Sequence, residues 1–411
     1  MFLVAGTCIG GGMLALPVAT GVSGFLPSIT IMAICWFAMT LTGLLLLEVS
    51  LWMEEGVHII TMTSRLLGTP GKVVSWILYT FVCYASLVGY TAGGGAQMAN
   101  AINTLFGLEL SRDLGSLIFL IIFGVVVDLG SQIIGRVNTI LFTAMICAYF
   151  ALIGIGIDEV KESNLWHARW PISLLAVPLT LTTFSFQTMV PSLTPYLKRN
   201  GRALRLAVIG GTTITFLVYL IWQWLILGIV PVEGPNGLVE ALRLGEPATI
   251  FLNQHVQGVW ISTVAEYFAF FAIVTSFLGI GLGLVDFLSD GLKIKNAGMG
   301  KLLLGALIMI PTLVFATQLE RVFILAMEWS GGIGDSILNG MIPVLMVWIG
   351  RYKMGYDGTF RVPGGKPLLV LTFIIFFLAF ALQIAAYLIP SAAEYVEDAF
   401  KVRIQEKVLL E

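Results

Sequence analysis

Long apolar runs separated by short polar segments recur along the entire chain. A helix that crosses a bilayer needs about 20 mostly apolar residues, and eleven runs come near this length. We therefore predict spanning helices at about 2–22, 28–53, 73–100, 114–134, 139–157, 172–197, 204–230, 259–288, 301–317, 322–349 and 368–389. Shorter helices are expected at 57–67, on the membrane surface, and at 239–244, within the polar stretch 231–257. The sequence Gly135-Arg136-Val137-Asn138 predicts a tight turn between the fourth and fifth spans.

Three consecutive glycines, Gly10-Gly11-Gly12, interrupt the first span. Glycine weakens a helix, and unpaired backbone groups survive inside a membrane only where they face protein or a water-filled cavity. The amides that follow the break, at Gly11, Gly12 and Met13, would attract a carboxylate, and the carbonyls before it would attract a cation or an ammonium group. A zwitterion fits both ends of such a break. A glycine-lined helix crossing is the alternative interpretation.

A second interruption opens the other half of the chain. Residues 183–191 place polar side chains and Pro191 in the middle of the sixth span. Spans 1–5 (about 1–157) and 6–10 (about 172–350) thus form two sets of five, each opening with its most disrupted helix. An odd number of spans inserts the second set upside down, and matched discontinuous helices mark the binding site of inverted-repeat transporters. We predict one all-α transport domain over 1–390, with an extra helix at 368–389 and an amphipathic tail at 391–411.

Composition supports a membrane protein and argues against catalysis. Hydrophobic residues make up 58% of the chain and charged residues 11%, whereas about a quarter of residues in soluble proteins are charged. The three histidines are scattered, and the four cysteines fall in predicted spans without metal-ligand spacing. We therefore expect neither an enzyme nor a cofactor, and membrane lipids rather than nucleic acid as surroundings. A channel would need rings of like residues in an oligomer, which fits the paired breaks less well.

Lysine and arginine predict the orientation of the chain in the membrane. If the loops alternate sides, 14 of the 22 basic residues lie in loops on the side of the N-terminus and five in the opposite loops. Cytoplasmic loops carry the excess of basic residues. We therefore expect a cytoplasmic N-terminus and a C-terminus on the other, periplasmic side.

Four segments resemble those of a known family, the aromatic amino-acid permeases that carry tryptophan and tyrosine. They are Gly6-Thr7-x-Ile9-Gly10-x-Gly12-Met13-Leu14-Ala15-Leu16-Pro17, Ser185-Phe186-x-x-x-x-Pro191-Ser192-Leu193, Leu47-Glu48-Val49-Ser50-Leu51-Trp52-Met53 and Leu284-x-Asp286-Phe287. The likeness is strongest to bacterial, chlamydial-type tyrosine-specific transport proteins. It implies the LeuT-type fold, a 5+5 inverted repeat with helices 1 and 6 broken, and cation-driven symport by alternating access across the bacterial inner membrane. Gln187-Thr188 departs from the family pattern and leaves tyrosine, tryptophan and phenylalanine open as substrates.

The resemblance also implies a substrate site at the two breaks. The substrate carboxylate would meet the amides of Gly11 and Gly12, and its ammonium group the carbonyls of Cys8, Phe184 and Gln187. An aromatic side chain needs apolar walls and one or two orienting polar groups, although the tyrosines of the third helix could equally be packing residues. The full candidate set is Thr7, Cys8, Gly10, Gly11, Gly12, Tyr84, Tyr90, Phe184, Ser185, Phe186 and Gln187.

Two kinds of coupling ion are compatible with the residues, a proton and sodium. For sodium, the segment around Thr275 and Ser276 resembles the cation site of neurotransmitter-type relatives of this fold, and a cage of oxygens would come from Gly6, Ile9, Ala272, Thr275 and Ser276. The competing interpretation is that both hydroxyls bond their own helix. For a proton, acids inside a membrane are costly and therefore suspect. Of the five candidates, which are Glu48, Asp128, Glu266, Glu328 and Asp335, we favour Glu266 and Glu328.

Overall fold

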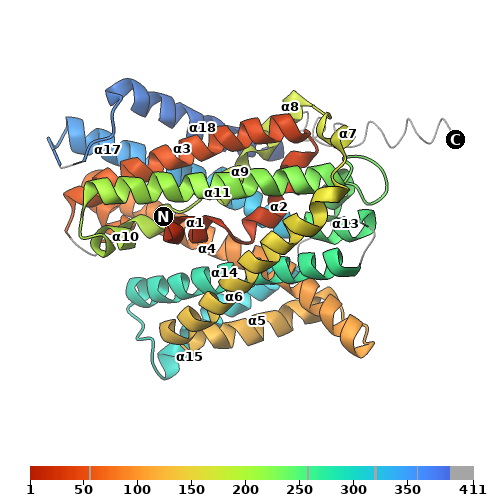
Figure 1. The fold of residues 1–411 in the computed structure, drawn as a ribbon. Coiled ribbons are helices and arrows are strands. Elements are labelled where there is room, and N and C mark those ends of the chain that lie inside the picture. Colours follow the sequence, from red (N-terminus) through yellow and green to blue (C-terminus); the bar gives the residue numbers. More distant parts are fainter. Residues whose placement is uncertain (55–56, 257–258, 319–321, 359, 389–411) are drawn as a thin grey trace.

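The computed structural model spans residues 1–411 and describes all of them except 55–56, 257–258, 319–321, 359 and 389–411 (Figure 1). Secondary structure in the described residues is helical throughout. The first half contains α1 Phe2–Cys8, α2 Gly12–Gly21, α3 Phe25–Trp52, α4 Ile59–Phe106, α5 Arg112–Asp128, α6 Ser131–Gly156, η1 Ile157–Glu159 and α7 Glu162–Leu165.

The second half opens with short helical pieces and continues with long ones. Its elements are α8 Trp170–Ser173, η2 Leu174–Ala176, α9 Val177–Thr183, η3 Gln187–Met189, α10 Val190–Tyr196, α11 Gly201–Ile229, α12 Leu238–Leu244, α13 Ala248–His255, α14 Val259–Leu292, α15 Met299–Gln318, α16 Val322–Trp329, the π-helix η4 Ser330–Met341, α17 Ile342–Tyr352 and α18 Gly365–Leu388. Within the described residues, nine helices are long and apolar enough to cross a membrane, and the bent pair α1–α2 makes ten. The predicted fourth span corresponds to α5, which has 17 residues.

The boundary between the fourth and fifth spans differs from the prediction. We expected one span to reach residue 134 and the turn to fall at Gly135-Arg136-Val137-Asn138, and this is wrong, because α5 ends at Asp128 and α6 runs through those four residues. The chain reverses at Gly130, whose φ is 96°. Glycine adopts this backbone conformation without the clash that a β-carbon would cause.

Two further segments bear on the predicted loops. The predicted surface helix ends where expected, because Gly68 has a φ of 71° inside α4 and divides it. The polar stretch after α11 contains α12 at the expected place and a second short helix, α13, that we did not predict. The amphipathic tail expected at 391–411 lies outside the described residues.

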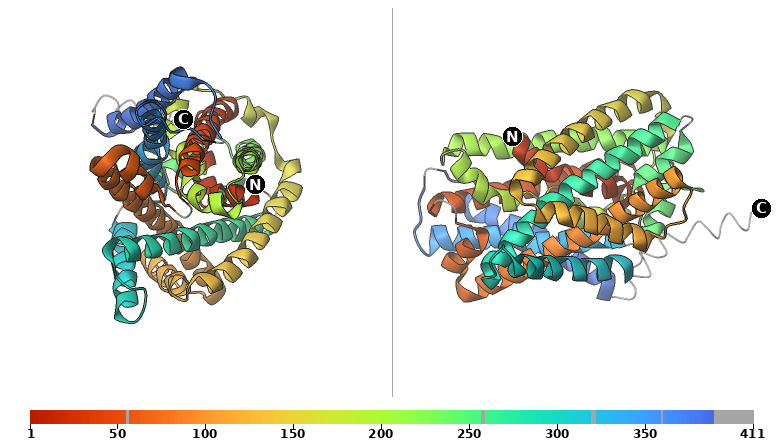
Figure 2. Two further views of the ribbon diagram at one scale, coloured as in Figure 1. Left: turned by 90° about the vertical axis from the view of Figure 1, so that its left-hand side faces the viewer. Right: turned by 90° about the horizontal axis from the view of Figure 1, so that it is seen from below.

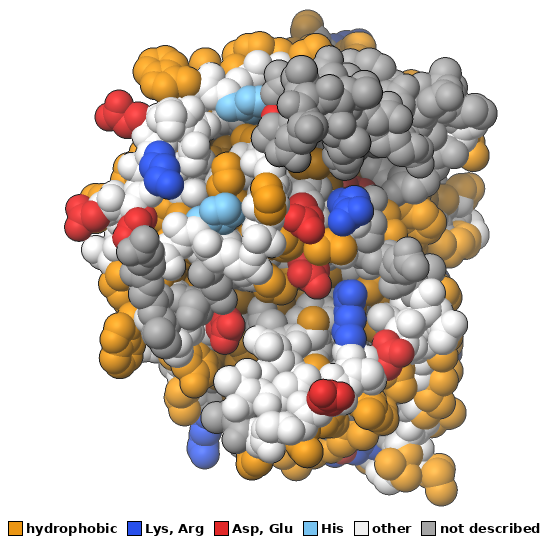
Figure 3. Space-filling model, turned by 90° about the vertical axis from the view of Figure 1, so that its right-hand side faces the viewer, with side chains coloured by type: hydrophobic (Ala, Val, Ile, Leu, Met, Phe, Trp, Pro, Cys, Tyr) orange, Lys and Arg blue, Asp and Glu red, His pale blue; other side chains and the backbone are white. Residues whose placement is uncertain are grey.

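The long helices run lengthwise through the molecule, with the two predicted broken spans between them (Figure 1). On one side lie α3, α17 and α18, and on the other α5, α6, α14 and α15, as the end-on view also shows (Figure 2). In the interior, α1 packs against α11, and α2 against α9. Charged side chains gather on the end of the bundle shown in Figure 3, while hydrophobic side chains dominate its rim. This distribution is what a membrane-spanning bundle requires.

Candidate functional site

The first span is broken where the three glycines predicted it. Helix α1 ends at Cys8, Ile9 is extended (φ −74°, ψ 103°), and α2 begins at Gly12 at an angle of 59° to α1. Close packing explains the glycines, since a β-carbon at Gly10 would collide with Ser276 Oγ and one at Gly11 with the Tyr90 ring. The break is therefore held by α14 and α4, which supply these two side chains.

The sixth span is also broken, between α9 and α10. Phe184 and Phe186 have non-helical backbones, with φ of −104° and −139°. The amides of Phe184 and Ser185 bond three residues back, to Leu181 and Thr182, which tightens the last turn of α9. Pro191 lies in the first turn of α10, where a missing N–H costs nothing. The prediction of two discontinuous spans is thus confirmed.

The two breaks meet at one hydroxyl group, that of Tyr219 on α11. Its Oη lies 2.6 Å from the Cys8 carbonyl, at the end of α1, and 3.0 Å from the Thr183 carbonyl, at the end of α9. Tyr219 is fully buried. A hydroxyl has one proton to donate, so it satisfies one of these carbonyls at a time. Because helix C-termini carry partial negative charge, this point favours a cationic or hydrogen-bond-donating group.

Two more side chains of α11 bind the first span. Pro17 has no N–H for the Met13 carbonyl one turn earlier, and the Trp222 indole donates to that carbonyl instead, at 3.1 Å. The Gln223 amide donates to Thr20 Oγ1. Residues 219, 222 and 223 share one helix face. We did not predict these three residues from the sequence. Their spacing of three and four residues within an apolar span could have indicated them.

The amide side of the first break faces α14. The Gly11 N–H donates to Ser276 Oγ at 3.0 Å, and the Ala272 carbonyl lies near Gly10. The Thr275 hydroxyl donates to the Ala272 carbonyl of its own helix, at 3.1 Å. Of the remaining residues of the predicted sodium cage, Ile9 is buried in the break and Gly6 faces Phe142 on α6. The structure thus brings Ala272 and Ser276 to the break, while Gly6 faces another helix.

The candidates from the sixth span point in different directions. Phe184 is fully buried and lies edge-on to Tyr219, with 5.2 Å between ring centroids. Phe186 packs instead against Gly43 on α3. The Gln187 amide nitrogen donates to the Met39 carbonyl and to Thr42 Oγ1 of α3, each at 3.1 Å, and its oxygen accepts from the Phe186 N–H. Phe184 therefore faces the meeting point, whereas Phe186 and Gln187 anchor the break to α3.

Three predicted residues, Thr7, Tyr84 and Glu266, lie apart from the meeting point. Thr7 is exposed and bonds the Leu3 carbonyl of its own helix. The Tyr84 hydroxyl donates to the Leu307 carbonyl on α15 at 2.7 Å. Glu266 is exposed on α14, and Glu328 is half-buried on α16. By contrast, Cys8 is buried at the break and Gly12 contacts Thr183 closely, since a β-carbon there would lie 3.3 Å from its Cγ2.

Ser185 joins the sixth span to the π-helix η4. Its Oγ donates to Asp335 Oδ1 at 2.8 Å and accepts from Asn339 Nδ2 at 3.0 Å. Asp335 belongs to the intramembrane acids noted in the sequence, although it was not one of the two we favoured. No group of three or more His, Cys, Asp and Glu side chains that could hold a metal occurs in the described part of the chain.

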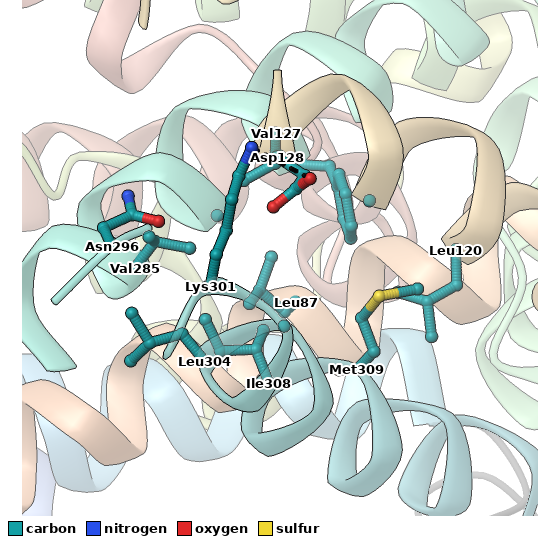
Figure 4. A pocket seen from close by; sticks show the side chains of 14 residues that line it. Leu87, Leu120, Val127, Asp128, Val285, Asn296, Lys301, Leu304, Ile308 and Met309 are labelled. Atoms are coloured by element: carbon teal, nitrogen blue, oxygen red, sulfur yellow. Dashed lines mark ion pairs between the residues drawn. The ribbon is translucent and has the colours of Figure 1, made fainter. Parts of the chain in front are cut away.

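A separate small pocket lies between α5, α14 and α15 (Figure 4). Its volume is about 40 Å³, and the ion pair of Asp128 with Lys301, at 3.1 Å, lies beside apolar side chains such as Leu304 and Met309. None of the residues of either break lines it. This pocket is therefore distinct from the meeting point of the two broken spans.

Comparison with known proteins identifies the family of this chain. The sequence profile of the tryptophan/tyrosine permease family matches residues 1–384. The chain is 31% identical over 383 residues to a tyrosine-specific transport system 1 of Haemophilus influenzae, with 91% of this chain and 92% of the relative covered. It is 29% identical over 400 residues to a tryptophan-specific transport protein of the same organism, with 94% and 95% covered.

A solved structure shares the fold. It is a nucleobase-cation-symport-1 family transporter in a closed conformation with bromovinylhydantoin bound, which superposes with a TM-score of 0.60 at 16% identity over 97% of this chain and 96% of that one. The all-α inverted-repeat fold predicted from the two sets of five spans is thereby confirmed. With a family profile that matches nearly the whole chain and two broken spans that meet inside the bundle, this multi-span membrane protein belongs to the tryptophan/tyrosine permease family.

Proposed function

We propose that the protein imports aromatic amino acids, tyrosine foremost, across the bacterial inner membrane by cation-coupled symport and alternating access. Family membership supports a permease, and the relatives are named as tyrosine- and tryptophan-specific carriers. The two relatives are similarly distant, so tryptophan is the alternative substrate. The N-terminus would be cytoplasmic, as the distribution of basic residues predicts.

The observation that carries the proposal is the contact of one hydroxyl with the carbonyl ends of both broken spans. Tyr219 Oη lies within hydrogen-bonding distance of the Cys8 and Thr183 carbonyls and donates to one of them at a time. Ser276 Oγ accepts from the Gly11 N–H. A zwitterionic amino acid offers the same two functions, an ammonium donor and a carboxylate acceptor. On binding, its ammonium group would replace the Tyr219 hydroxyl and its carboxylate the Ser276 hydroxyl. Its ring would lie among Tyr90, Phe184 and Tyr219.

Uptake into proteoliposomes tests this function. Labelled tyrosine, tryptophan and phenylalanine are offered under an imposed proton gradient, an imposed sodium gradient or neither. Accumulation above the external concentration under one gradient supports symport and is incompatible with a channel. Tyramine lacks the carboxylate and 4-hydroxyphenylpropionate lacks the ammonium group, so neither should compete at concentrations at which unlabelled tyrosine competes. Absence of uptake of all three amino acids would refute the substrate class.

A glycine variant tests the position of the site. Gly11→Val places side-chain atoms in the space of the Tyr90 ring and should abolish uptake while the protein still inserts. Gly154→Val on α6 is the matched control, because no atom lies within 4 Å of the added β-carbon. Both variants are compared with the parent by size-exclusion profile in detergent. Normal uptake by a well-folded Gly11→Val protein would show that the substrate does not bind at the first break.

A further inference from the structure

A compact polar cluster connects the break in the sixth span to the π-helix η4. Asp335 Oδ1 accepts from Ser185 Oγ at 2.8 Å and from Asn339 Nδ2 at 2.6 Å, and Asn339 Nδ2 also donates to Ser185 Oγ. Asp335 and Asn339 are both fully buried. The three side chains thus form a closed triangle of hydrogen bonds, with one corner in the break itself.

The donors of this cluster are fully used, but two of its acceptors are not. Both protons of the Asn339 amide and the proton of the Ser185 hydroxyl are committed within the triangle. Asp335 Oδ2 and Asn339 Oδ1 are buried and have no hydrogen-bond partner among the described residues. Buried polar atoms of this kind are costly and call for an explanation.

Among the described residues, no positively charged side chain of lysine, arginine or histidine pairs with the Asp335 carboxylate. Two titratable groups of α4, Cys83 and Tyr90, lie near enough to interact with it. From α9, the neutral Thr182 faces it together with Ser185. An isolated charge inside a membrane is expensive unless it is neutralised or paired.

The backbone that holds the cluster is unusual. Residues Ser330–Met341 form a π-helix. Such segments are rare in proteins, and those that occur often lie at functional sites. Four glycines let neighbouring elements approach closely. A β-carbon at Gly331 would meet the Pro178 carbonyl, at Gly332 the Gln383 side chain, and at Gly334 the Val82 side chain. The π-helix is therefore packed closely against α4, α9 and α18, and Asp335 is fully buried within it.

We propose that Asp335 binds and releases the coupling proton, with Oδ2 as the atom that receives it. The inference rests on the proposed function and identifies the coupling ion of the symport as a proton. A proton added to Oδ2 removes the unpaired charge and turns an orphan acceptor into a donor. Sodium fits less well, because it would require several more oxygen ligands than the two left free here.

The connection to Ser185 explains how the proton would act on the substrate site. A hydrogen bond to an ionised carboxylate is shorter and stronger than one to a neutral acid. The break in the sixth span is therefore held firmly to η4 when Asp335 is charged and more loosely when it is protonated. Since Phe184 adjoins Ser185 and faces Tyr219, proton uptake and substrate binding alter the same turn.

Asp335→Asn separates proton coupling from substrate movement. In proteoliposomes, this variant should no longer accumulate tyrosine above the external level under a proton gradient, while exchange of internal for external tyrosine continues. The matched control is Asp128→Asn, which removes an acid paired with Lys301 away from the breaks and should retain proton-driven accumulation. Asp335→Glu keeps the ionisable group and should retain part of the proton-driven accumulation, while the exchange retained by Asp335→Asn shows that this variant is folded.

An infrared measurement tests the proton site without transport. A step in pH changes the carboxylic-acid band through every acid that titrates. One component of that change should be present in the parent and in Asp128→Asn and missing in Asp335→Asn. Proton-driven accumulation by Asp335→Asn equal to the parent would overturn the inference while leaving the proposed function intact. Sodium-driven accumulation that only Asp335→Asn loses would overturn it in favour of sodium. If the parent transports no aromatic amino acid but shows the band change, the proton site stands and the proposed function fails.

Discussion

Replacing Arg351 by methionine tests how a buried charge pair supports the bundle. Arg351, in α17, and Glu48, in α3, have side chains that are 2% and 1% exposed. Arg351 Nε lies 2.7 Å from Glu48 Oε1, and its second contact is with Oε2 at 2.5 Å. The backbone of Val362 completes the network, since its N–H donates to Glu48 Oε2 and its carbonyl accepts from Arg351. The pair therefore ties α3, α17 and the segment that precedes α18 together.

The expected cost follows from the burial of both groups. In Arg351→Met, the Glu48 carboxylate stays buried with only the Val362 amide as donor, and such a loss costs about 3–5 kcal/mol of the free energy of unfolding. Replacing both residues, as Glu48→Leu with Arg351→Met, removes the stranded charge, and apolar replacement of a buried pair is often about neutral. The double variant should thus be more stable than Arg351→Met alone.

Unfolding in detergent micelles, followed by tryptophan fluorescence, measures these differences. Lys301→Met is the matched control, because its partner Asp128 and Lys301 itself are 48% and 34% exposed. An exposed pair contributes about 0–1 kcal/mol, so this variant should unfold close to the parent. If Arg351→Met unfolds as the parent does, or if the double variant is the less stable of the two, the buried pair does not support the fold in the way described.

Three further predictions concern the breaks. Tyr219→Phe leaves a carbonyl at the meeting point without a donor and should lower the free energy of unfolding by about 1–3 kcal/mol. The loss should be smaller in saturating tyrosine, because the ammonium group of tyrosine replaces the missing donor. Thermal unfolding with and without tyrosine measures both losses, and equal losses would contradict the prediction. Trp222→Phe leaves the Met13 carbonyl unpaired and should lower the free energy of unfolding by a similar amount. In a Pro17→Ala background the loss should be smaller, because residue 17 regains an N–H that can pair with this carbonyl. The same loss in both backgrounds would contradict the pairing of Trp222 with Met13. Gln187→Met should lower stability yet preserve the relative uptake of tyrosine, tryptophan and phenylalanine, because Gln187 faces α3; an altered preference would return Gln187 to the substrate site.

The class of protein, the order of most spans and the two breaks could be predicted from the sequence because each depends on local properties. Twenty apolar residues span a bilayer in any fold, and Gly10-Gly11-Gly12 weakens a helix wherever it occurs. The turn after α5 was misplaced because several glycines in the region could reverse the chain, and the choice of Gly130 depends on how the two helices pack.

The assignment of side chains to the site required the tertiary structure. Tyr84 and Tyr90 are six residues apart on α4, and at about 3.6 residues per turn they point about 120° apart. In a helix that is apolar on all sides, no pattern distinguishes the face toward α15 from the face toward the breaks. The structure directs Tyr84 to the Leu307 carbonyl and Tyr90 to Gly11.

Contacts between distant segments were decided in the same way. Tyr219 reaches carbonyls that lie 211 and 36 residues away along the chain, and Ser185 reaches Asp335 across 150 residues. The sequence identifies where backbone groups lose their partners, because that is a property of neighbouring residues. Which side chain replaces those partners depends on the rotation and depth of each helix, and packing alone determines both.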